Sequence, residues 1–127
     1  EYGDRIQLGT VVLLLDRLRP VRARLVAHQG IIQGVDLQLA GDRPCRIGRD
    51  SSCDLVIPPY AGDVSAQHAE VAYGPEGYLL SDLGSTNGTR VCRGQDVLDV
   101  MQRHGVRLVH GDVIALGREL KLRYVEE

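Results

Sequence analysis

The sequence of 127 residues contains no Trp and no Phe, only one Met, and Lys121 as its only Lys. Without these large aromatic side chains, Val, Leu and Ile must fill the core, and branched side chains favour closely packed strands. The longest apolar run, residues 11–15, is far shorter than the roughly 20 residues of a membrane-spanning helix. Because the chain begins with Glu1 and shows no signal-peptide pattern, we expect a part of a longer cytoplasmic protein.

The sequence also lacks the patterns that are typical of metal-binding, nucleotide-binding and nucleic-acid-binding proteins. The three Cys, at positions 45, 53 and 92, form no Cys-x-x-Cys and no Cys/His pairing at zinc-ligand spacing. We therefore expect reduced thiols, no metal and no cofactor. The sequence has neither of the glycine-rich nucleotide loops, GxGxxG and GxxxxGK[ST]. A net charge of −2 argues against nucleic-acid binding through a basic surface.

Glycine-rich turn signals separate short apolar or alternating runs along most of the chain. In residues 35–39 and 120–124, apolar and polar side chains alternate, which is typical of strands with one buried face. This spacing predicts an all-β sandwich or barrel over residues 21–127, preceded by a short extension, residues 1–20. The expected strands are residues 21–27, 34–39, 45–48, 55–57, 68–73, 78–82, 89–92, 106–108, 113–116 and 119–124.

Two segments do not fit the strand pattern. Residues 10–19 have apolar residues at helical spacing, with Thr10 as a candidate N-cap and Pro20 as a stop, although their β-branched residues leave a strand open. An apolar stripe of this length favours association between chains, so we expect residues 1–19 to mediate a homodimer. Residues 95–104 are expected to form a longer loop or one helical turn.

Three short motifs lie on the loops between these strands: Arg-Ile-Gly-Arg at 46–49, Ser-Ala-Gln-His at 65–68, and Asp-Leu-Gly-Ser-Thr-Asn-Gly-Thr at 82–89. Singly, each has an ordinary structural explanation. Arg49 could be a solvated residue at a strand end, and residues 65–68 could close a turn through a side-chain hydrogen bond. Asn87-Gly88 could be a type I′ hairpin turn.

In this order and spacing, the motifs resemble those of the forkhead-associated domain, and the resemblance runs from about residue 22 to residue 125. It includes His-Gly-Asp-Val-Ile at 110–114, before a final pair of strands. The family folds as a β-sandwich of about eleven mostly antiparallel strands and binds phosphothreonine peptides with the loops at one end. The resemblance therefore implies a phosphothreonine-dependent interaction module in Ser/Thr kinase signalling.

By this resemblance, Arg49, Ser65 and Thr86 hold the phosphate, and Asn87 holds the peptide backbone. The chemistry of these side chains agrees, because phosphothreonine carries nearly two negative charges and three strong acceptor oxygens. The guanidinium of Arg49 is a planar donor fork that matches phosphate. The amide of Asn87 both donates and accepts, as an extended peptide backbone requires.

The same resemblance implies structural roles for Gly48, His68 and Gly88. Gly48 would permit the turn that aims Arg49, and His68 would brace the loop that carries Ser65. Gly88 would supply the positive φ of the hairpin that follows Asn87.

At one position the sequence departs from the family pattern. The residue after Ser65 is often polar in the family and contacts the ligand, whereas Ala66 offers only its backbone. We expect this difference either to lower the affinity or to shift contacts onto Gln67 and Ser51.

Two alternatives to this interpretation differ in class. Ser65, His68 and Asp82 contain the residue types of a catalytic triad, but no nucleophile-elbow sequence surrounds the serine, so we expect no enzyme. The second alternative is a phosphate-independent scaffold domain with the same fold. It is disfavoured because a purely structural domain has no need of Arg49, Ser65 and Asn87 together. We expect neither nucleic acid nor an inserted membrane segment among the partners.

Overall fold

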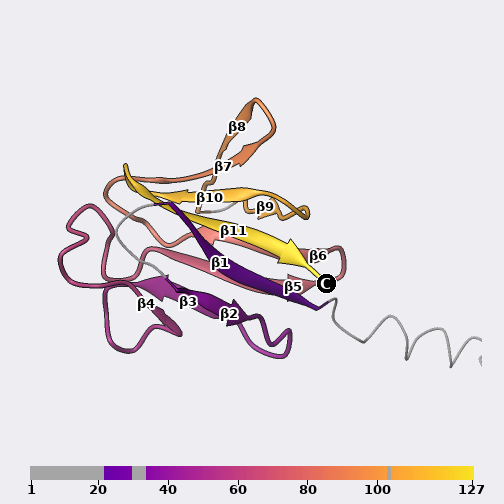
Figure 1. The fold of residues 1–127 in the computed structure, drawn as a ribbon, viewed down its shortest axis with the longest axis horizontal. Coiled ribbons are helices and arrows are strands. Elements are labelled where there is room, and N and C mark those ends of the chain that lie inside the picture. Colours follow the sequence, from indigo (N-terminus) through magenta and orange to yellow (C-terminus); the bar gives the residue numbers. More distant parts are fainter. Residues whose placement is uncertain (1–21, 30–33, 103) are drawn as a thin grey trace, which may run out of the picture.

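Eleven β-strands make up the regular structure of the part of the chain that the computed structural model describes, residues 22–29, 34–102 and 104–127. One sheet has the strand order β2-β1-β11-β10-β7-β8, and the second has the order β4-β3-β5-β6-β9 (Figure 1). The strands are β1 (Ala23–Gln29), β2 (Asp36–Gln38), β3 (Cys45–Gly48), β4 (Leu55–Val56), β5 (Ala69–Gly74), β6 (Gly77–Asp82), β7 (Thr89–Arg93), β8 (Asp96–Asp99), β9 (Val106–Arg107), β10 (Val113–Leu116) and β11 (Leu120–Glu126).

The core lies between the two sheets and is built mainly from the branched aliphatic side chains of Val, Leu and Ile, with two tyrosines among them. In β11 the alternation of the sequence is reproduced, because Leu120, Leu122 and Tyr124 are buried while the residues between them are not. Side chains from both sheets join them in one cluster, among them Ile47 of β3 and Leu80 of β6. The predicted β-sandwich is therefore confirmed, with Val, Leu and Ile in place of the missing Trp and Phe.

One element of the sequence-based prediction is wrong. Residues 95–104 contain strand β8, rather than a long loop or a helical turn. Gly94, with φ of 61°, lies in a short turn that folds β8 back onto β7, with Arg93 opposite Asp96. The resulting hairpin projects from the sandwich (Figure 1). The expected extension, residues 1–20, lies outside the described residues.

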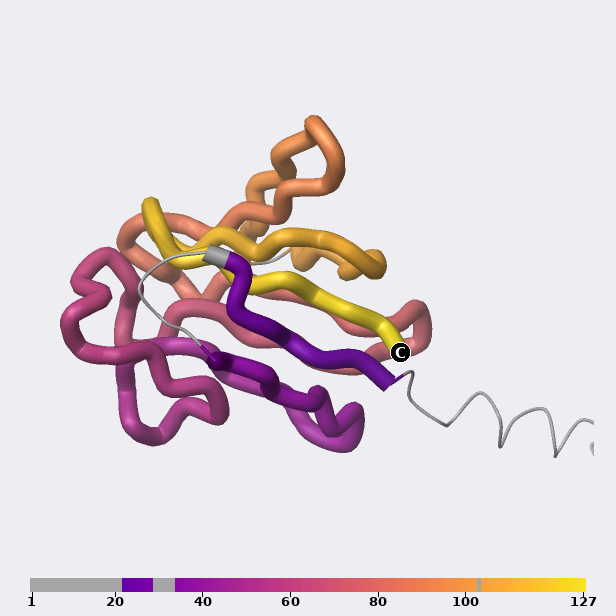
Figure 2. Tube along the Cα trace, in the orientation of Figure 1, coloured from indigo at the N-terminus to yellow at the C-terminus, as the bar shows by residue number. Residues whose placement is uncertain are grey.

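Loops from both sheets meet at one end of the sandwich (Figure 2). The turn between β10 and β11 lies beside two others, because Gly117 N–H donates to Gly88 O at 3.1 Å and Arg118 N–H donates to Asp63 Oδ2 at 2.6 Å. At the opposite end, Glu127 N–H donates to Arg22 O at 2.8 Å. The loops that carry the three sequence motifs thus lie at the end remote from Arg22 and Glu127 (Figures 1 and 2).

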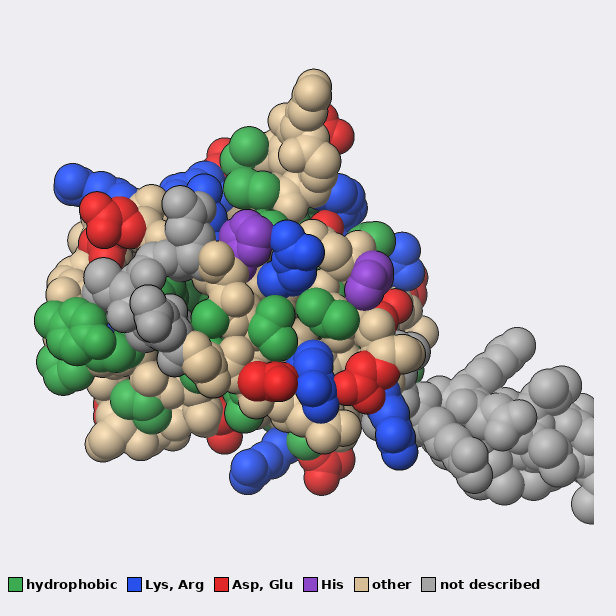
Figure 3. Space-filling model, in the orientation of Figure 1, with side chains coloured by type: hydrophobic (Ala, Val, Ile, Leu, Met, Phe, Trp, Pro, Cys, Tyr) green, Lys and Arg blue, Asp and Glu red, His purple; other side chains and the backbone are tan. Residues whose placement is uncertain are grey.

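On the face shown in Figure 3, acidic and basic side chains of the described residues are interspersed. Among those residues, no helix is long and apolar enough to cross a membrane.

A buried carboxylate, Asp112, pairs with a partly exposed arginine of β7, Arg93. Asp112, which is 1% exposed, accepts hydrogen bonds from Arg93 Nε at 2.9 Å and Arg93 Nη2 at 2.8 Å. It also accepts the backbone N–H of Val109 at 2.8 Å. If the carboxylate is removed, Arg93 Nε and Val109 N–H lose this acceptor, while Arg93 Nη2 keeps the carbonyl oxygen of Arg107 at 2.9 Å.

We expect Asp112→Ala to lower the free energy of unfolding by about 3 kcal/mol. This lies at the low end of the range for breaking a buried ion pair, because Arg93 can still reach water. Urea unfolding measures the change. The control, Asp36→Ala, removes the exposed partner of Arg24 and should cost at most about 1 kcal/mol. Equal effects of the two variants would show that the Arg93–Asp112 pair adds nothing to stability.

Candidate functional site

His68 joins two of the loops at this end of the sandwich. Its ring is fully buried, and Nδ1 accepts the backbone N–H of Ser65 at 3.0 Å. The other ring nitrogen, Nε2, lies 2.9 Å from the carbonyl oxygen of Gly88. Because a carbonyl can only accept, Nε2 carries the proton and the ring is in its neutral form. One side chain thereby fixes the β4–β5 loop to the β6–β7 loop.

Arg49 begins the loop after β3 and reaches toward the β4–β5 loop. Its backbone N–H donates to Ser65 O at 3.2 Å, and its side-chain Nε donates to Val64 O. The two terminal nitrogens of the guanidinium make no hydrogen bond and no ion pair with any residue in the described part of the chain. The Nε contact thus orients the fork and leaves its outer edge available to an anion.

Ser65 and Thr86 come from different loops and are in direct contact. Ser65 Oγ accepts the backbone N–H of Thr86 at 3.0 Å, so the serine hydroxyl proton can be donated elsewhere. Asn87 Nδ2 donates to Asp63 O at 3.0 Å, which leaves its Oδ1 and one amide hydrogen for another partner. The fold therefore brings Arg49, Ser65, Thr86 and Asn87 together at one end, while their roles toward a ligand stay predictions.

A buried carboxylate shapes the loop that carries Thr86 and Asn87. Asp82 accepts the backbone N–H groups of Gly84 and Ser85 at 3.0 and 2.9 Å, and also accepts from two hydroxyls, those of Ser85 and Thr89. Burial alone would raise the pKa of Asp82, but these hydrogen bonds outweigh burial and lower the pKa below its usual value. The carboxylate is therefore ionised at neutral pH and fixes the loop. Gly88 follows with φ of 88°, which only glycine adopts readily.

Gly48 does not have a positive φ, so its contribution does not come from a left-handed backbone. Instead, a Cβ at this position would lie 2.1 Å from Ala66 O and 2.8 Å from Ala66 C. Only glycine allows the backbone before Arg49 to pack this closely against the Ser65–His68 segment.

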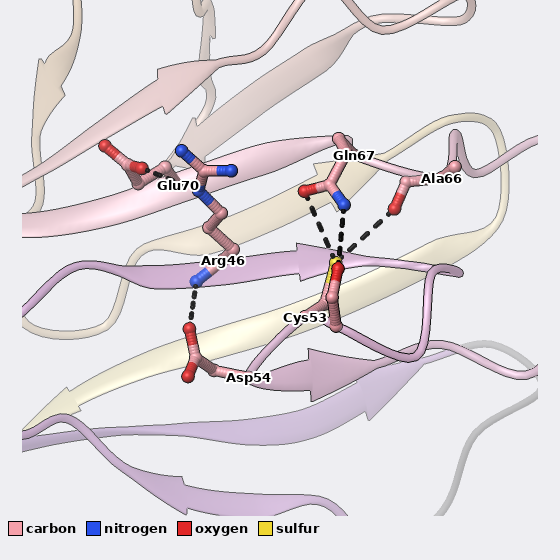
Figure 4. Close-up of polar contacts among 7 residues, drawn as sticks. Arg46, Cys53, Asp54, Ala66, Gln67 and Glu70 are labelled. Carbon is pink, nitrogen blue, oxygen red and sulfur yellow. Dashed lines mark hydrogen bonds and ion pairs between the residues drawn. The ribbon is translucent and has the colours of Figure 1, made fainter.

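The loop of residues 49–54, here called the arginine loop, is held at its C-terminal end by contacts with two neighbouring segments (Figure 4). Asp54 Oδ2 accepts the backbone N–H of Arg46 at 2.9 Å, and the side chain of Arg46 joins β3 to β5 by donating from Nε to Glu70 Oε1 at 3.2 Å. On the other side, Cys53 Sγ lies 3.4 Å from Ala66 O and 3.7 Å from Gln67 Oε1. Burial raises the pKa of the Cys53 thiol, so it is a neutral donor here.

The three residues named for additional ligand contacts differ in their surroundings. Ser51 is exposed at the tip of the arginine loop. Ala66 uses its carbonyl to accept Asp50 N–H at 3.1 Å. The side chain of Gln67 is engaged within the protein, because its Nε2 donates to Asp50 Oδ2 and Ser52 Oγ, each at 3.2 Å.

Sequence reasoning missed two residues that organise this end of the molecule. Asp63 joins three loops, through its carbonyl to Asn87 and its carboxylate to Arg118 N–H. Asp50 receives Ser52 N–H and Gln67 Nε2. The Asp-Ser-Ser run after Arg49 was a signal for a tight Asx turn that could have identified Asp50.

A comparison with known families now decides the classification. The model of the FHA domain, the forkhead-associated domain, matches residues 45–117. This chain belongs to the FHA domain family. The match spans the arginine loop, the Ser65–His68 segment and the Asp82–Thr89 motif, which together form the loop end of this FHA domain.

Similar proteins agree with the family assignment. The FHA domain-containing protein FhaB of Mycolicibacterium smegmatis is 36% identical over 78 residues, which are 61% of this chain and 48% of FhaB. The chain thus spans about half the length of that relative. A solved FHA domain of an Arabidopsis thaliana hypothetical protein superposes with a TM-score of 0.72 at 27% identity, covering 84% of this chain and 86% of that one.

A second solved structure belongs to a study of phosphothreonine-dependent FHA domain interactions. It has a TM-score of 0.67 and 28% identity, and the superposition covers 84% of this chain and 97% of that one. Both structures place the sandwich described here in the FHA fold.

We expect His68→Ala to lower the free energy of unfolding by at least about 2 kcal/mol. The reason is that Ser65 N–H loses its acceptor, at a cost of about 1–3 kcal/mol. Removal of the fully buried ring also leaves a cavity, while Gly88 O keeps Gly117 N–H as a partner. Thermal and urea unfolding measure the effect, with the exposed His104→Ala as the matched control. Unchanged melting of His68→Ala together with lost ligand binding would instead place His68 in the ligand site.

Proposed function

We propose that this FHA domain binds phosphothreonine-containing peptides, with Arg49, Ser65 and Thr86 on the phosphate and Asn87 on the peptide backbone. The observation that carries the proposal is the set of unused donors at the loop end. The terminal nitrogens of Arg49 have no partner among the described residues, and the hydroxyl of Ser65 has a proton to donate. The chain's likeness to a domain studied for phosphothreonine-dependent interactions supports the ligand class.

The chemistry of the site suits a dianion with three acceptor oxygens. The planar fork of Arg49 can give two parallel hydrogen bonds to two phosphate oxygens. Ser65 and Thr86, which lie in contact through Thr86 N–H, can reach a third oxygen with their hydroxyls. Since the Nε contact and the backbone contacts hold these groups before the ligand arrives, little side-chain freedom is lost on binding.

The contacts of the serine, histidine and buried aspartate support a binding role rather than catalysis. His68 Nδ1 accepts from the backbone of Ser65 and not from its hydroxyl. Asp82 accepts hydrogen bonds from Ser85 and Thr89, and no hydrogen bond joins it to His68, both of which lie in the described part of the chain. A nucleophile would need a base at its hydroxyl and an orienting group on that base, which these contacts do not provide.

We further propose that the domain acts in Ser/Thr kinase signalling as one part of a longer, cytoplasmic protein. The relative FhaB, about half of which is covered by this chain, supports the longer protein. All three cysteines are free, which supports a reducing compartment.

We expect Arg49→Ala to weaken binding of a phosphothreonine peptide by about a hundredfold or more. Each hydrogen bond to a charged group contributes about 1.5–3 kcal/mol, and the variant loses two. The peptide is first selected from a degenerate phosphothreonine library, and titration calorimetry then measures its affinity.

The matched control is Arg46→Ala, which removes an arginine three positions earlier whose side chain pairs with Glu70. Its affinity should stay within about twofold of the wild type. The unphosphorylated peptide serves as the second control. Equal affinity for the phosphorylated and unphosphorylated peptides would contradict the proposal and favour the phosphate-independent scaffold.

The homodimer through residues 1–19 is a separate proposal, which lies outside the described residues and rests on the sequence. Its support is the apolar stripe at helical spacing, Leu8, Val11, Val12, Leu15 and Leu18.

Deletion of residues 1–19 should convert a dimer into a monomer, because the stripe is removed while the sandwich is kept. Light scattering at high protein concentration measures the mass of both forms. If the full chain is already a monomer, the dimer proposal is wrong.

A further inference from the structure

Two opposite charges are adjacent in the sequence at the candidate site, yet they do not pair. Asp50 directly follows Arg49, but no ion pair joins Arg49 to any carboxylate in the part of the chain that the structure describes. An Arg–carboxylate pair would occupy the same fork that a phosphate needs. Something must therefore hold the Asp50 carboxylate elsewhere.

The contacts of Asp50 identify what holds it. Oδ1 accepts the backbone N–H of Ser52 at 3.0 Å, and Oδ2 accepts Gln67 Nε2 at 3.2 Å. The hydrogen bond from the Ser52 backbone, followed by that from Gln67, lowers the pKa of Asp50 below its usual value. Asp50 is therefore an anion at neutral pH, and its charge can compete for Arg49 whenever it is released.

Both the nitrogen and the oxygen of the Gln67 amide face residues of the arginine loop (Figure 4). Besides Asp50, Nε2 donates to Ser52 Oγ at 3.2 Å, and Oε1 faces the thiol of Cys53 at 3.7 Å. Gln67 itself sits just before β5, in the segment whose backbone is fixed against β3 by His68 N–H donating to Ile47 O at 2.9 Å. The amide thus extends from a fixed strand to three residues of the arginine loop.

The shape of the arginine loop makes such an external contact important. It joins β3 and β4, which are parallel neighbours with Ile47 opposite Leu55. Parallel strands usually require a connection of about a dozen residues or more. Here the six residues 49–54 make the connection, so the loop turns tightly and its side chains at positions 50, 52 and 53 come within reach of Gln67.

We propose that Gln67 is a positioning residue for phosphate recognition, which holds the Asp50 carboxylate away from Arg49 and so keeps the guanidinium available to the phosphate. The inference rests on the proposed function, because it concerns the same phosphate. It gives Gln67 a role in place of the direct ligand contact expected from the sequence. A residue that only braced the loop would act through shape, whereas Gln67 in this proposal acts through the charge of Asp50.

A double-mutant cycle separates the two possibilities. We expect Gln67→Leu, which keeps a similar size but cannot donate, to weaken binding of the library-selected phosphothreonine peptide about tenfold. Asp50→Asn alone should leave the affinity within about twofold of the wild type. The double variant Gln67→Leu/Asp50→Asn should recover to within about threefold of the wild type, because the competing charge is gone.

The controls keep the result interpretable. Gln95→Leu replaces an exposed glutamine in the β7–β8 turn, far from the arginine loop, and should bind like the wild type. Urea unfolding verifies that each variant is folded. If Gln67→Leu does not fold, Gln67→Glu takes its place, since it keeps the shape and puts a second anion beside Asp50, and Asp50→Asn should rescue it as well.

The inference is wrong if the Gln67 variant binds the phosphopeptide as tightly as the wild type. It is also wrong if the double variant binds as weakly as the Gln67 variant alone, because Gln67 would then act only on the shape of the loop. Failure of the proposed function is distinguishable, because then the wild-type domain would already bind the phosphorylated and unphosphorylated peptides equally.

Discussion

The arrangement of the loop end depends on one buried imidazole. The ring of His68 makes two hydrogen bonds: one nitrogen accepts the backbone N–H of Ser65, and the other donates to the carbonyl oxygen of Gly88 in the β6–β7 loop. Gly88 O also accepts Gly117 N–H, so the β10–β11 turn is tied to the same point. Because the ring is neutral and fully buried, these bonds are shielded from competing water. Loops from two sheets are thus fixed relative to one another without the aid of a ligand.

The second constraint is electrostatic. An anion site needs a positive group that its own protein does not neutralise, yet the loop end contains several carboxylates. Each of those closest to the motifs has donors of its own: Asp82 has Ser85 and Thr89, Asp63 has Arg118 N–H, and Asp50 has Ser52 N–H and Gln67. The acidic residues therefore stabilise the loops, while Arg49 keeps its terminal nitrogens available.

Much of this fold could be predicted from the sequence, because its strands obey two simple patterns. Alternation marked β11, and glycine-rich turns separated most of the others. The β8 strand was missed because Val97, Leu98, Val100 and Met101 fit a helical turn equally well at this length. The turn at Gly94 and the pairing with β7 favour a strand over a helical turn, and hydrophobic periodicity reveals neither of them.

The candidate site could be predicted only in part. The motifs indicated which side chains gather at one end, since the family resemblance supplied their order. The contacts of His68 with Gly88 and of Gln67 with Asp50 join residues about twenty positions apart, and they depend on how the sheets place the loops. The way in which Gly48 contributes could not be predicted for the same reason. A sequence suggests a turn at a glycine, whereas a close approach of Ala66 is visible only once the strands are paired.

The hydrogen bond between Glu127 and Arg22 bears on how such a domain can be attached to other polypeptide segments. Both residues lie at the end opposite the loops, so any polypeptide attached at Arg22 and Glu127 would be joined to one small area of the surface (Figure 1). A domain attached in this way would present its loops on the side remote from the attachment. The local concentration of a target on the same polypeptide is then set by linker length and stiffness, rather than by the orientation of the sandwich.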